Sequence, residues 1–231
     1  MNDKKTLVFL HGWGVSSKIF EPLFYYLKDD FNIYAADLPG FGQTPIKKVM
    51  TLKDYADFVY EFLKTNKIED PMIIGHSFGG AVAVKLALLY PESISKLILV
   101  SASAIRQPHR KMLLLKKSAD ILKPLLPEKI RKLILKLFGY DKTDYAQIES
   151  RELKETFKHI IGEDLRPYFH LIKTPTLVIW GEKDAITPLS EGKTIDENIT
   201  GAKLKIIKNA SHFTFLDEPQ EFIKLIKEFV L

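Results

Sequence analysis

The chain has 231 residues, 46% of them hydrophobic, which is enough to bury the core of one α/β domain and argues against disorder. It has no cysteine and no apolar run near the ~20 residues of a membrane-spanning helix, so disulfides, thiolate metal sites and a transmembrane segment are excluded, and we expect a cytoplasmic protein. The net charge of +5 comes from one segment, because residues 106–136 carry ten lysines and arginines against two acidic residues, while the remainder sums to −3.

Short apolar runs alternate along the chain with longer amphipathic stretches. Most of the short runs are continuously apolar, which is typical of parallel strands that are covered on both faces. The predicted strands are Thr6–Leu10, Ile33–Ala36, Met72–Ile74, Leu97–Val100, Thr176–Trp180 and Leu204–Ile207.

Two of the amphipathic stretches have clear helix signals. Thr51 and Asp54 fit a capping box, and Pro219 stands near the start of the last stretch. Both stretches show an apolar face at helical spacing. The predicted faces are Leu52, Tyr55, Ala56, Val59 and Phe62 in the first helix, and Phe222, Leu225, Ile226 and Phe229 in the last.

The alternation of strands and helices predicts an α/β fold with an open, doubly wound, mostly parallel sheet of about six strands. The segment from 105 to 170 breaks this alternation, because it has no convincing strand and is rich in leucine and lysine. We therefore expect a core made of residues 1–104 and 171–231, with residues 105–170 forming a helical lid inserted after the fourth strand.

Three polar clusters follow predicted strands, and they contain a hydroxyl, a carboxylate and an imidazole. Ser77 follows the third strand, Asp184 the fifth and His212 the sixth. Because the carboxyl ends of parallel strands share one edge, these side chains are expected to meet there, although they stand 107 and 28 residues apart. This order of residues is that of a Ser-Asp-His nucleophilic site.

The sequence around Ser77 is GHSFGG, and its glycines have a physical reason. A serine on a sharp strand-to-helix turn needs neighbours without side chains, which Gly75 and Gly79 provide. Phe78 would then open a helix with a free backbone N–H for a developing negative charge. A second donor is expected from the loop after the first strand, residues 11–14.

The motifs HGWG, DLPGFG, GHSFGG, GEKD and SHF occur in this order, and together they resemble the α/β-hydrolase superfamily over nearly the whole chain. The resemblance implies that Ser77 is the nucleophile, Asp184 the orienting acid and His212 the base. It also implies that the backbone amides of Trp13 and Phe78 form the oxyanion hole. The sequences of the first two motifs, HGWG and DLPGFG, are similar to those of small carboxylesterases, among them the methyl-ester carboxylesterases of biotin synthesis, and of related C–C hydrolases.

Each of these residues also has a simpler interpretation. Ser77 could be an ordinary helix N-cap, and Asp184 could cap a turn, with Glu182 as a rival carboxylate. His212 could be a loop histidine packed on nearby phenylalanines. Two more histidines are expected to be structural, namely His11 and His76.

The first loop also approaches a dinucleotide-binding pattern, Gly12-x-Gly14-x-x-Ser17, with Asp37 at the end of the next strand. Ser17 replaces the third glycine of that pattern, and Trp13 stands where a phosphate should approach. The nucleotide interpretation also leaves the serine, aspartate and histidine unexplained. We expect Asp37 to organise its own turn.

The predicted function is a serine hydrolase that cleaves carboxylic esters of small or medium acyl chains through an acyl-enzyme, with no cofactor and no metal. A C–C bond hydrolase, thioesterase or acyltransferase on the same triad is the alternative, and a ligand-binding sensor is the alternative of another class. The expected partner is a small-molecule ester. The basic lid is either a solvated helix face or a docking site for an acidic carrier protein or anionic surface, and no motif indicates nucleic acid.

Overall fold

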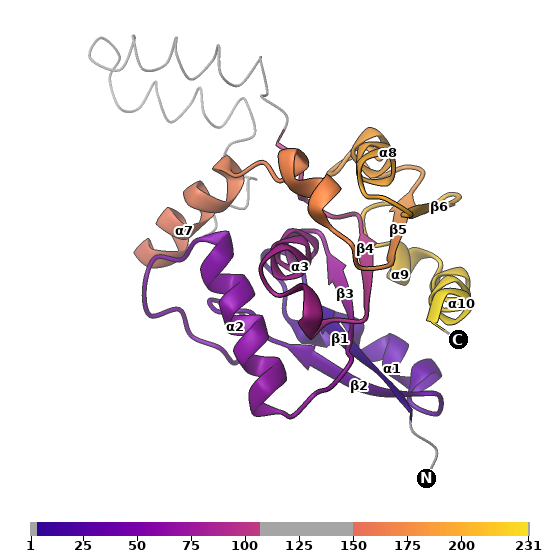
Figure 1. The fold of residues 1–231 in the computed structure, drawn as a ribbon, viewed down its shortest axis with the longest axis horizontal. Helices are drawn as coiled ribbons and strands as arrows, with labels where there is room; N and C mark the ends of the chain where they lie inside the picture. The colour runs from indigo at the N-terminus through magenta and orange to yellow at the C-terminus, as the bar shows by residue number, and fades with distance from the viewer. Residues whose placement is uncertain (1–3, 107–149, 231) are drawn as a thin grey trace, which may run out of the picture.

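The computed structural model describes residues 4–106 and 150–230. Within them, six strands form one sheet in the order β2-β1-β3-β4-β5-β6, and every neighbouring pair is parallel. In chain order the strands are β1 (Lys5–Leu10), β2 (Phe31–Ala36), β3 (Met72–His76), β4 (Lys96–Val100), β5 (Thr176–Gly181) and β6 (Lys203–Ile207). The six predicted strands and the doubly wound α/β fold are confirmed (Figure 1).

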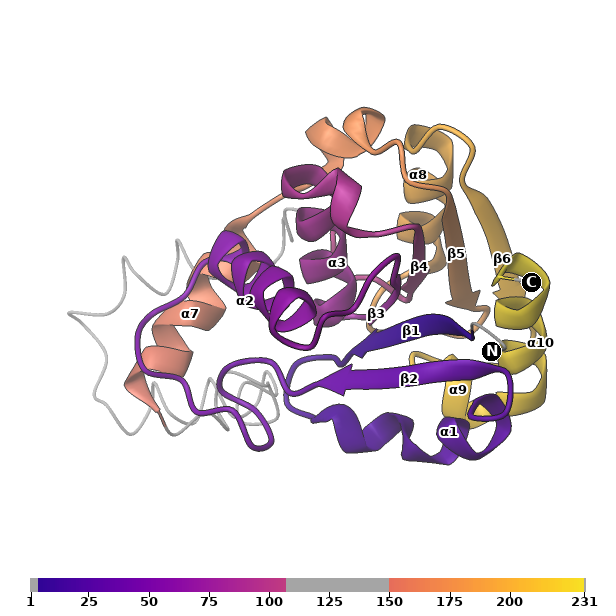
Figure 2. The same cartoon turned by 60° about the horizontal axis from the view of Figure 1, so that its bottom comes forward.

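Helices cover both faces of the sheet. Figure 2 shows α2, α3 and α8 on one side, and α1, α9 and α10 on the other. Their bounds are α1 (Glu21–Leu27), α2 (Leu52–Thr65), α3 (Phe78–Leu89), α8 (Leu189–Asn198), α9 (Thr214–Asp217) and α10 (Pro219–Val230). Two short 3-10 helices, η1 (Ser17–Phe20) and η2 (Pro91–Ser93), precede α1 and β4.

The core has two layers because the strands are buried on both faces. Along β1, Val8 and Leu10 belong to one apolar cluster, while Leu7 and Phe9 belong to the other, and all four are completely buried. This explains why the strands are continuous apolar runs rather than alternating ones.

The order of strands reverses direction between β1 and β3. The chain leaves β1 towards β2 on one side and later returns to form β3 on the other side. The carboxyl edge of the sheet beside such a reversal is where ligands bind in open α/β sheets. Ser77 and residues 11–14 were expected to meet at this edge.

The capping box of α2 is present, because the Thr51 side chain accepts from Asp54 N and Asp54 accepts from Thr51 N. The predicted apolar face of α2 needs one correction. Leu63, rather than Phe62, is the last fully buried residue, and Phe62 is only partly buried against the core. Both positions lie one turn beyond Val59, and packing against the sheet selects between them.

Most of the predicted lid, residues 107–149, lies outside the described residues. The chain that follows is helical, with α7 (Arg151–Gly162) and then η4 (Arg166–Leu171). The described residues before and after 107–149 meet, since Leu165 N donates to Ala104 O at 3.1 Å. Among the described residues, no helix combines the length and apolar character that a membrane span requires.

Candidate active site

Ser77 occupies the one-residue turn between β3 and α3, with φ 52° and ψ −115°. This is a strained conformation for a residue with a side chain. Its glycine neighbours allow the turn to close, because a Cβ atom on Gly75 would lie 2.5 Å from the carbonyl oxygen of Gly79. The sequence therefore places a half-buried hydroxyl at the carboxyl edge of the sheet at the cost of local strain.

The end of β4 holds this turn in place. Ser77 N donates to Val100 O at 3.0 Å, and Ser103 N donates to Ser77 O at 2.9 Å. The backbone of the strained residue is thus held on both sides, by the last residue of β4 and by the loop that follows β4, which is what keeps a strained conformation populated.

The loop after β1 lies against the serine. A Cβ atom on Gly12 would lie 3.0 Å from His76 Nδ1 and 3.3 Å from the Cβ of Ser77, so a side chain there would push these neighbours slightly apart. The ring of Trp13 packs edge-on against that of Phe78, with centroids 5.3 Å apart. Phe78 is the first residue of α3, so its N–H has no acceptor within the helix. The two residues predicted to supply oxyanion amides are therefore neighbours beside Ser77.

His11 is used to shape this loop. Its Nε2 accepts from Leu38 N at 3.0 Å, and its Nδ1 lies 2.7 Å from Gly12 O. Burial lowers the pKa of His11, against smaller opposing effects of the Gly12 hydrogen bond and of Asp37. This neutral, fully bonded ring fits the structural role expected of it.

Asp184 and His212 form a buried pair at the ends of β5 and β6. Asp184 Oδ2 lies 2.9 Å from His212 Nδ1. The other carboxylate oxygen, Oδ1, accepts from Ile186 N and Thr187 N, both at 2.9 Å. Burial alone would raise the pKa of Asp184, but the hydrogen bonds from His212 and Thr187 outweigh it and hold that pKa well below its usual range. The carboxylate is therefore charged and its orientation is fixed.

The rival carboxylate has a different place. Glu182 is exposed, and its Oε2 accepts from Asn209 N at 3.2 Å. Asp184, and not Glu182, is thus the carboxylate that lies against the imidazole.

His76 lies directly beneath the candidate base. Its Nε2 is 3.1 Å from His212 O, and the two ring centroids are 4.8 Å apart. Burial, reinforced by the neighbouring His212, lowers the pKa of His76 to about 3, so this ring is neutral. Its contact supports the backbone of His212, in line with the structural role expected from the sequence.

Helix α7 packs against Met50 and against Trp13 of the first loop. The hydroxyl of Thr156 accepts from Met50 N at 2.8 Å in a buried position. The ring of Phe157 packs on Trp13 with centroids 4.9 Å apart. Helix α7 is therefore docked on the core beside the candidate site.

The geometry does not favour a nucleotide site in this loop. The Asp37 carboxylate accepts from Ser17 N and Gln43 N, both at 2.8 Å, so it joins its own turn to the first loop as expected. Within residues 4–106 and 150–230, no cluster of three or more histidines and carboxylates is suited to a metal ion.

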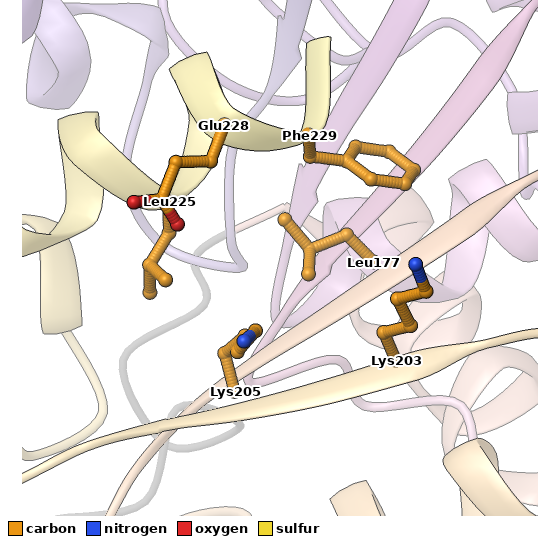
Figure 3. Close-up of a pocket in the computed structure, with 6 residues that line it drawn as sticks. All are labelled: Leu177, Lys203, Lys205, Leu225, Glu228 and Phe229. Carbon is orange, nitrogen blue, oxygen red and sulfur yellow. The ribbon is translucent and has the colours of Figure 1, made fainter.

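A cavity of about 170 Å³ lies between the sheet and α10 (Figure 3). Leu177 and Lys203 line it, and both stand near the starts of their strands. The cavity is therefore lined by the amino-terminal parts of β5 and β6 and by α10, and neither Ser77, Asp184 nor His212 lines it. Its lining is Leu177, Lys203, Lys205, Leu225, Glu228 and Phe229.

Thr187 is the residue near the site that sequence reasoning missed. Its hydroxyl lies 2.8 Å from Asp184 Oδ2 and 3.2 Å from His212 Nδ1. The spacing Asp-x-x-Thr could have indicated a turn closed by the aspartate. The contact with His212 depends on the tertiary fold and has no local signal.

Comparison with known proteins gives consistent results. A family model described as alpha/beta hydrolase fold matches residues 5–156 and 106–219. A pimeloyl-[acyl-carrier protein] methyl ester esterase of Wigglesworthia glossinidia brevipalpis is 30% identical over 247 residues, covering 97% of this chain and 93% of that protein.

Solved structures show the same fold. A hydrolase from Pseudomonas aeruginosa PA01 has a TM-score of 0.78 and 25% identity, covering 100% of this chain and 91% of that one. An esterase from Exiguobacterium antarcticum has a TM-score of 0.77 and 23% identity, covering 98% and 91%.

Proposed function

This chain belongs to the alpha/beta hydrolase fold family, and from that premise we propose that it is a serine carboxylesterase with Ser77, His212 and Asp184 as its catalytic triad. Its substrates would be carboxylic esters of small or medium acyl chains. The observation that carries the proposal is the strained backbone of Ser77, with φ 52° and ψ −115°, in the turn between β3 and α3. Strain of this kind is retained where it presents a nucleophile.

In the first half of the reaction, Ser77 Oγ attacks the acyl carbon of the ester while its proton passes to His212 Nε2. Asp184, bonded to Nδ1 at 2.9 Å, holds the tautomer that leaves Nε2 free and stabilises the imidazolium. The backbone N–H groups of Trp13 and Phe78 would bind the oxyanion, and losing one such donor typically costs ~10²–10³ in rate. The imidazolium then returns the proton to the departing alkoxide, which leaves as the alcohol.

In the second half, water attacks the acyl-enzyme and His212 takes one of its protons. The tetrahedral intermediate collapses and releases the carboxylic acid, while the His212 imidazolium returns the proton to Ser77 Oγ. Every proton transfer in this cycle goes to or from His212, so no further acid or base is required. Residues 105–170 would act as the lid that covers the acyl chain, with α7 as its docked end.

The acyl group could arrive on a carrier protein. The relative from Wigglesworthia is named for a carrier-linked methyl ester, and residues 106–136 of this chain carry a net charge of +8. A positive segment would attract an acidic carrier over long range. Apart from Arg106, that segment lies outside the described residues.

The first test is hydrolysis of p-nitrophenyl esters of increasing acyl length by the wild type and by Ser77→Ala. Alanine at position 77 should lower kcat by ~10⁴–10⁶, because triad members act as a unit. The acyl length with the highest kcat/KM would size the pocket. Equal turnover in both proteins would disprove the proposal. An inactive wild type would favour a C–C hydrolase, a thioesterase or a ligand-binding sensor instead.

A second assay compares a methyl ester on an acyl carrier protein with the same ester on a short thiol. If the basic segment docks the carrier, kcat/KM for the carrier-linked ester should fall as salt is raised, and that for the short ester should not. Equal salt dependence would argue against carrier docking while leaving the esterase proposal intact.

A further inference from the structure

Thr187 is buried in the loop between β5 and α8, only 4% exposed, and faces both members of the charged pair. Its hydroxyl oxygen lies 2.8 Å from Asp184 Oδ2, 3.2 Å from His212 Nδ1 and 3.2 Å from Ser101 O. The triad scheme above assigns no role to this hydroxyl.

The protons at this point can be counted. A threonine hydroxyl has one proton to donate and two lone pairs to accept. Asp184 Oδ2 and Ser101 O only accept, and the shorter distance to Oδ2 favours donation to the carboxylate. The lone pairs of Thr187 then face His212 Nδ1, which donates when it is paired with Asp184. The Nδ1–H is therefore shared between two acceptors, a three-centre arrangement.

The same residue fixes the acid loop to the sheet. Thr187 N donates to Asp184 Oδ1 at 2.9 Å, so backbone and side chain of Thr187 grip both carboxylate oxygens. Thr187 O accepts from the indole of Trp180 at 2.8 Å. Ser101 lies directly after Val100, whose carbonyl binds Ser77 N, so the end of β4 contacts both the nucleophile turn and the acid loop.

From these contacts we propose that Thr187 is a positioning residue of the site, whose hydroxyl orients the Asp184 carboxylate and serves as second acceptor for the Nδ1–H of His212. This inference rests on the proposed esterase function and adds a residue to it. Thr187 acts through Asp184 and His212, so its loss should slow turnover more than it weakens substrate binding.

Three variants separate the hydroxyl from its surroundings. Thr187→Val keeps the shape and removes the hydroxyl, and Thr187→Ser keeps the hydroxyl and removes the methyl group. Thr214→Val is the matched control, because Thr214 is completely buried near His212 and its Oγ1 has no hydrogen-bond partner among the described residues. The readouts are kcat and KM on the best p-nitrophenyl ester, and the downfield proton NMR signal of His212 Nδ1–H.

We expect Thr187→Val to lower kcat by ~10–100-fold, the usual loss for a hydrogen bond to a charged group, with KM within about 2-fold of wild type. Thr187→Ser should stay within about 3-fold of wild type in kcat. Thr214→Val should have the kcat of wild type. The Nδ1–H signal should move or broaden in Thr187→Val only. A side chain that merely fills space would change neither the signal nor the kcat-to-KM pattern in this way.

Two results would overturn the inference. One is a wild-type kcat and an unchanged Nδ1–H signal in Thr187→Val. The other is a Thr187→Ser variant as slow as Thr187→Val, which would assign the effect to the methyl group. The NMR signal needs no turnover, so it can also be recorded in Ser77→Ala. An inactive wild type whose signal still responds to Thr187→Val would refute the esterase function and leave the placement of Thr187 supported.

Discussion

Asp184 Oδ2 lies 2.9 Å from His212 Nδ1, and the two residues come from loops after neighbouring strands, 28 positions apart. The parallel pairing of β5 and β6 brings these loops to the same edge. Gly181 strengthens this arrangement, because a side chain there would strike the backbone oxygens of Ala210 and Ser211. The contact thus depends on sheet register and on a close approach of two loops.

This contact predicts the effect of Asp184→Asn. If the amide oxygen of the new side chain accepts from the two backbone N–H groups, its amide nitrogen faces the Nδ1–H of His212, donor against donor. In the reverse orientation, the amide nitrogen faces the two backbone N–H groups. We expect kcat to fall by ~10⁴, as for the equivalent change in other triads, because the imidazole is held in the wrong tautomer. Glu182→Gln is the matched control and should retain wild-type kcat. The assignment of the acid is wrong if the losses are reversed.

The strands could be predicted from the sequence because strands buried on both faces must be continuous apolar runs. The predicted strands stopped short of Gly75 and His76 in β3 and of Gly181 in β5, because polar or small side chains end the apolar run while the backbones still pair. The prediction of the buried face of α2 was wrong at Phe62, where Leu63 is buried instead, for a related reason. Helical periodicity allows either residue, and the tertiary contact decides.

The Asp184–His212 pair could also be predicted, because each residue follows a strand and the parallel pairing of β5 and β6 brings the two loops together. Thr187 could not, because its value lies in contacts with Ser101 and His212, which are 86 and 25 residues away. A hydroxyl that bonds across such distances leaves no pattern in the chain, whereas the glycines of a strained turn do.

Gly75 should tolerate no side chain. Its added Cβ would meet backbone atoms of Gly79 and Gly80 at 2.5–2.8 Å, and a backbone cannot turn aside as a side chain can. Gly75→Ala should therefore lower the free energy of unfolding by at least ~2 kcal/mol, measured by urea denaturation. The control is Gly162→Ala, since a Cβ at the end of α7 would meet nothing within 4 Å. That variant should gain ~0.5–1 kcal/mol from helix propensity. Equal effects of the two changes would contradict the steric explanation.

The docking of α7 predicts the effect of Thr156→Val. This change leaves Met50 N buried without its acceptor at 2.8 Å, so the free energy of unfolding should fall by ~1–3 kcal/mol. Loosening of α7 should also expose Trp13, which packs on Phe157. The chain has two tryptophans and Trp180 is completely buried, so a red shift and easier quenching of fluorescence would report on Trp13.

A control for this experiment is Thr194→Val on α8. Its hydroxyl only donates to Ser190 O of the same helix, at an exposed position. Stability and fluorescence should stay close to wild type. If Thr156→Val leaves both unchanged, then α7 is not held to the core by this bond.

Glu191 predicts a pH dependence of stability. It lies in the first turn of α8 and is 7% exposed. Burial raises the pKa of Glu191 to about 7; Arg106 and Arg166 oppose the rise, and Asp184 and Asp164 add to it. Between its ordinary value of 4.5 and about 7, the unfolded chain releases the proton while the folded protein keeps it. The unfolded state then binds fewer protons, so the free energy of unfolding falls as pH rises through this window.

The test is urea unfolding of wild type and Glu191→Gln at pH 5 and pH 8. Glutamine cannot ionise, so the wild type should lose ~2–3 kcal/mol more than the variant between the two values, at 1.36 kcal/mol for each unit of pKa shift. Glu197→Gln on the exposed side of α8 is the matched control and should lose as much as wild type. Parallel losses in all three proteins would show that Glu191 is not protonated in the folded state. A larger loss in wild type would mean that Glu191 becomes charged above pH 7, close to the charged Asp184. The hydrogen bonds that position Asp184 in the candidate triad would then act against repulsion from this second carboxylate.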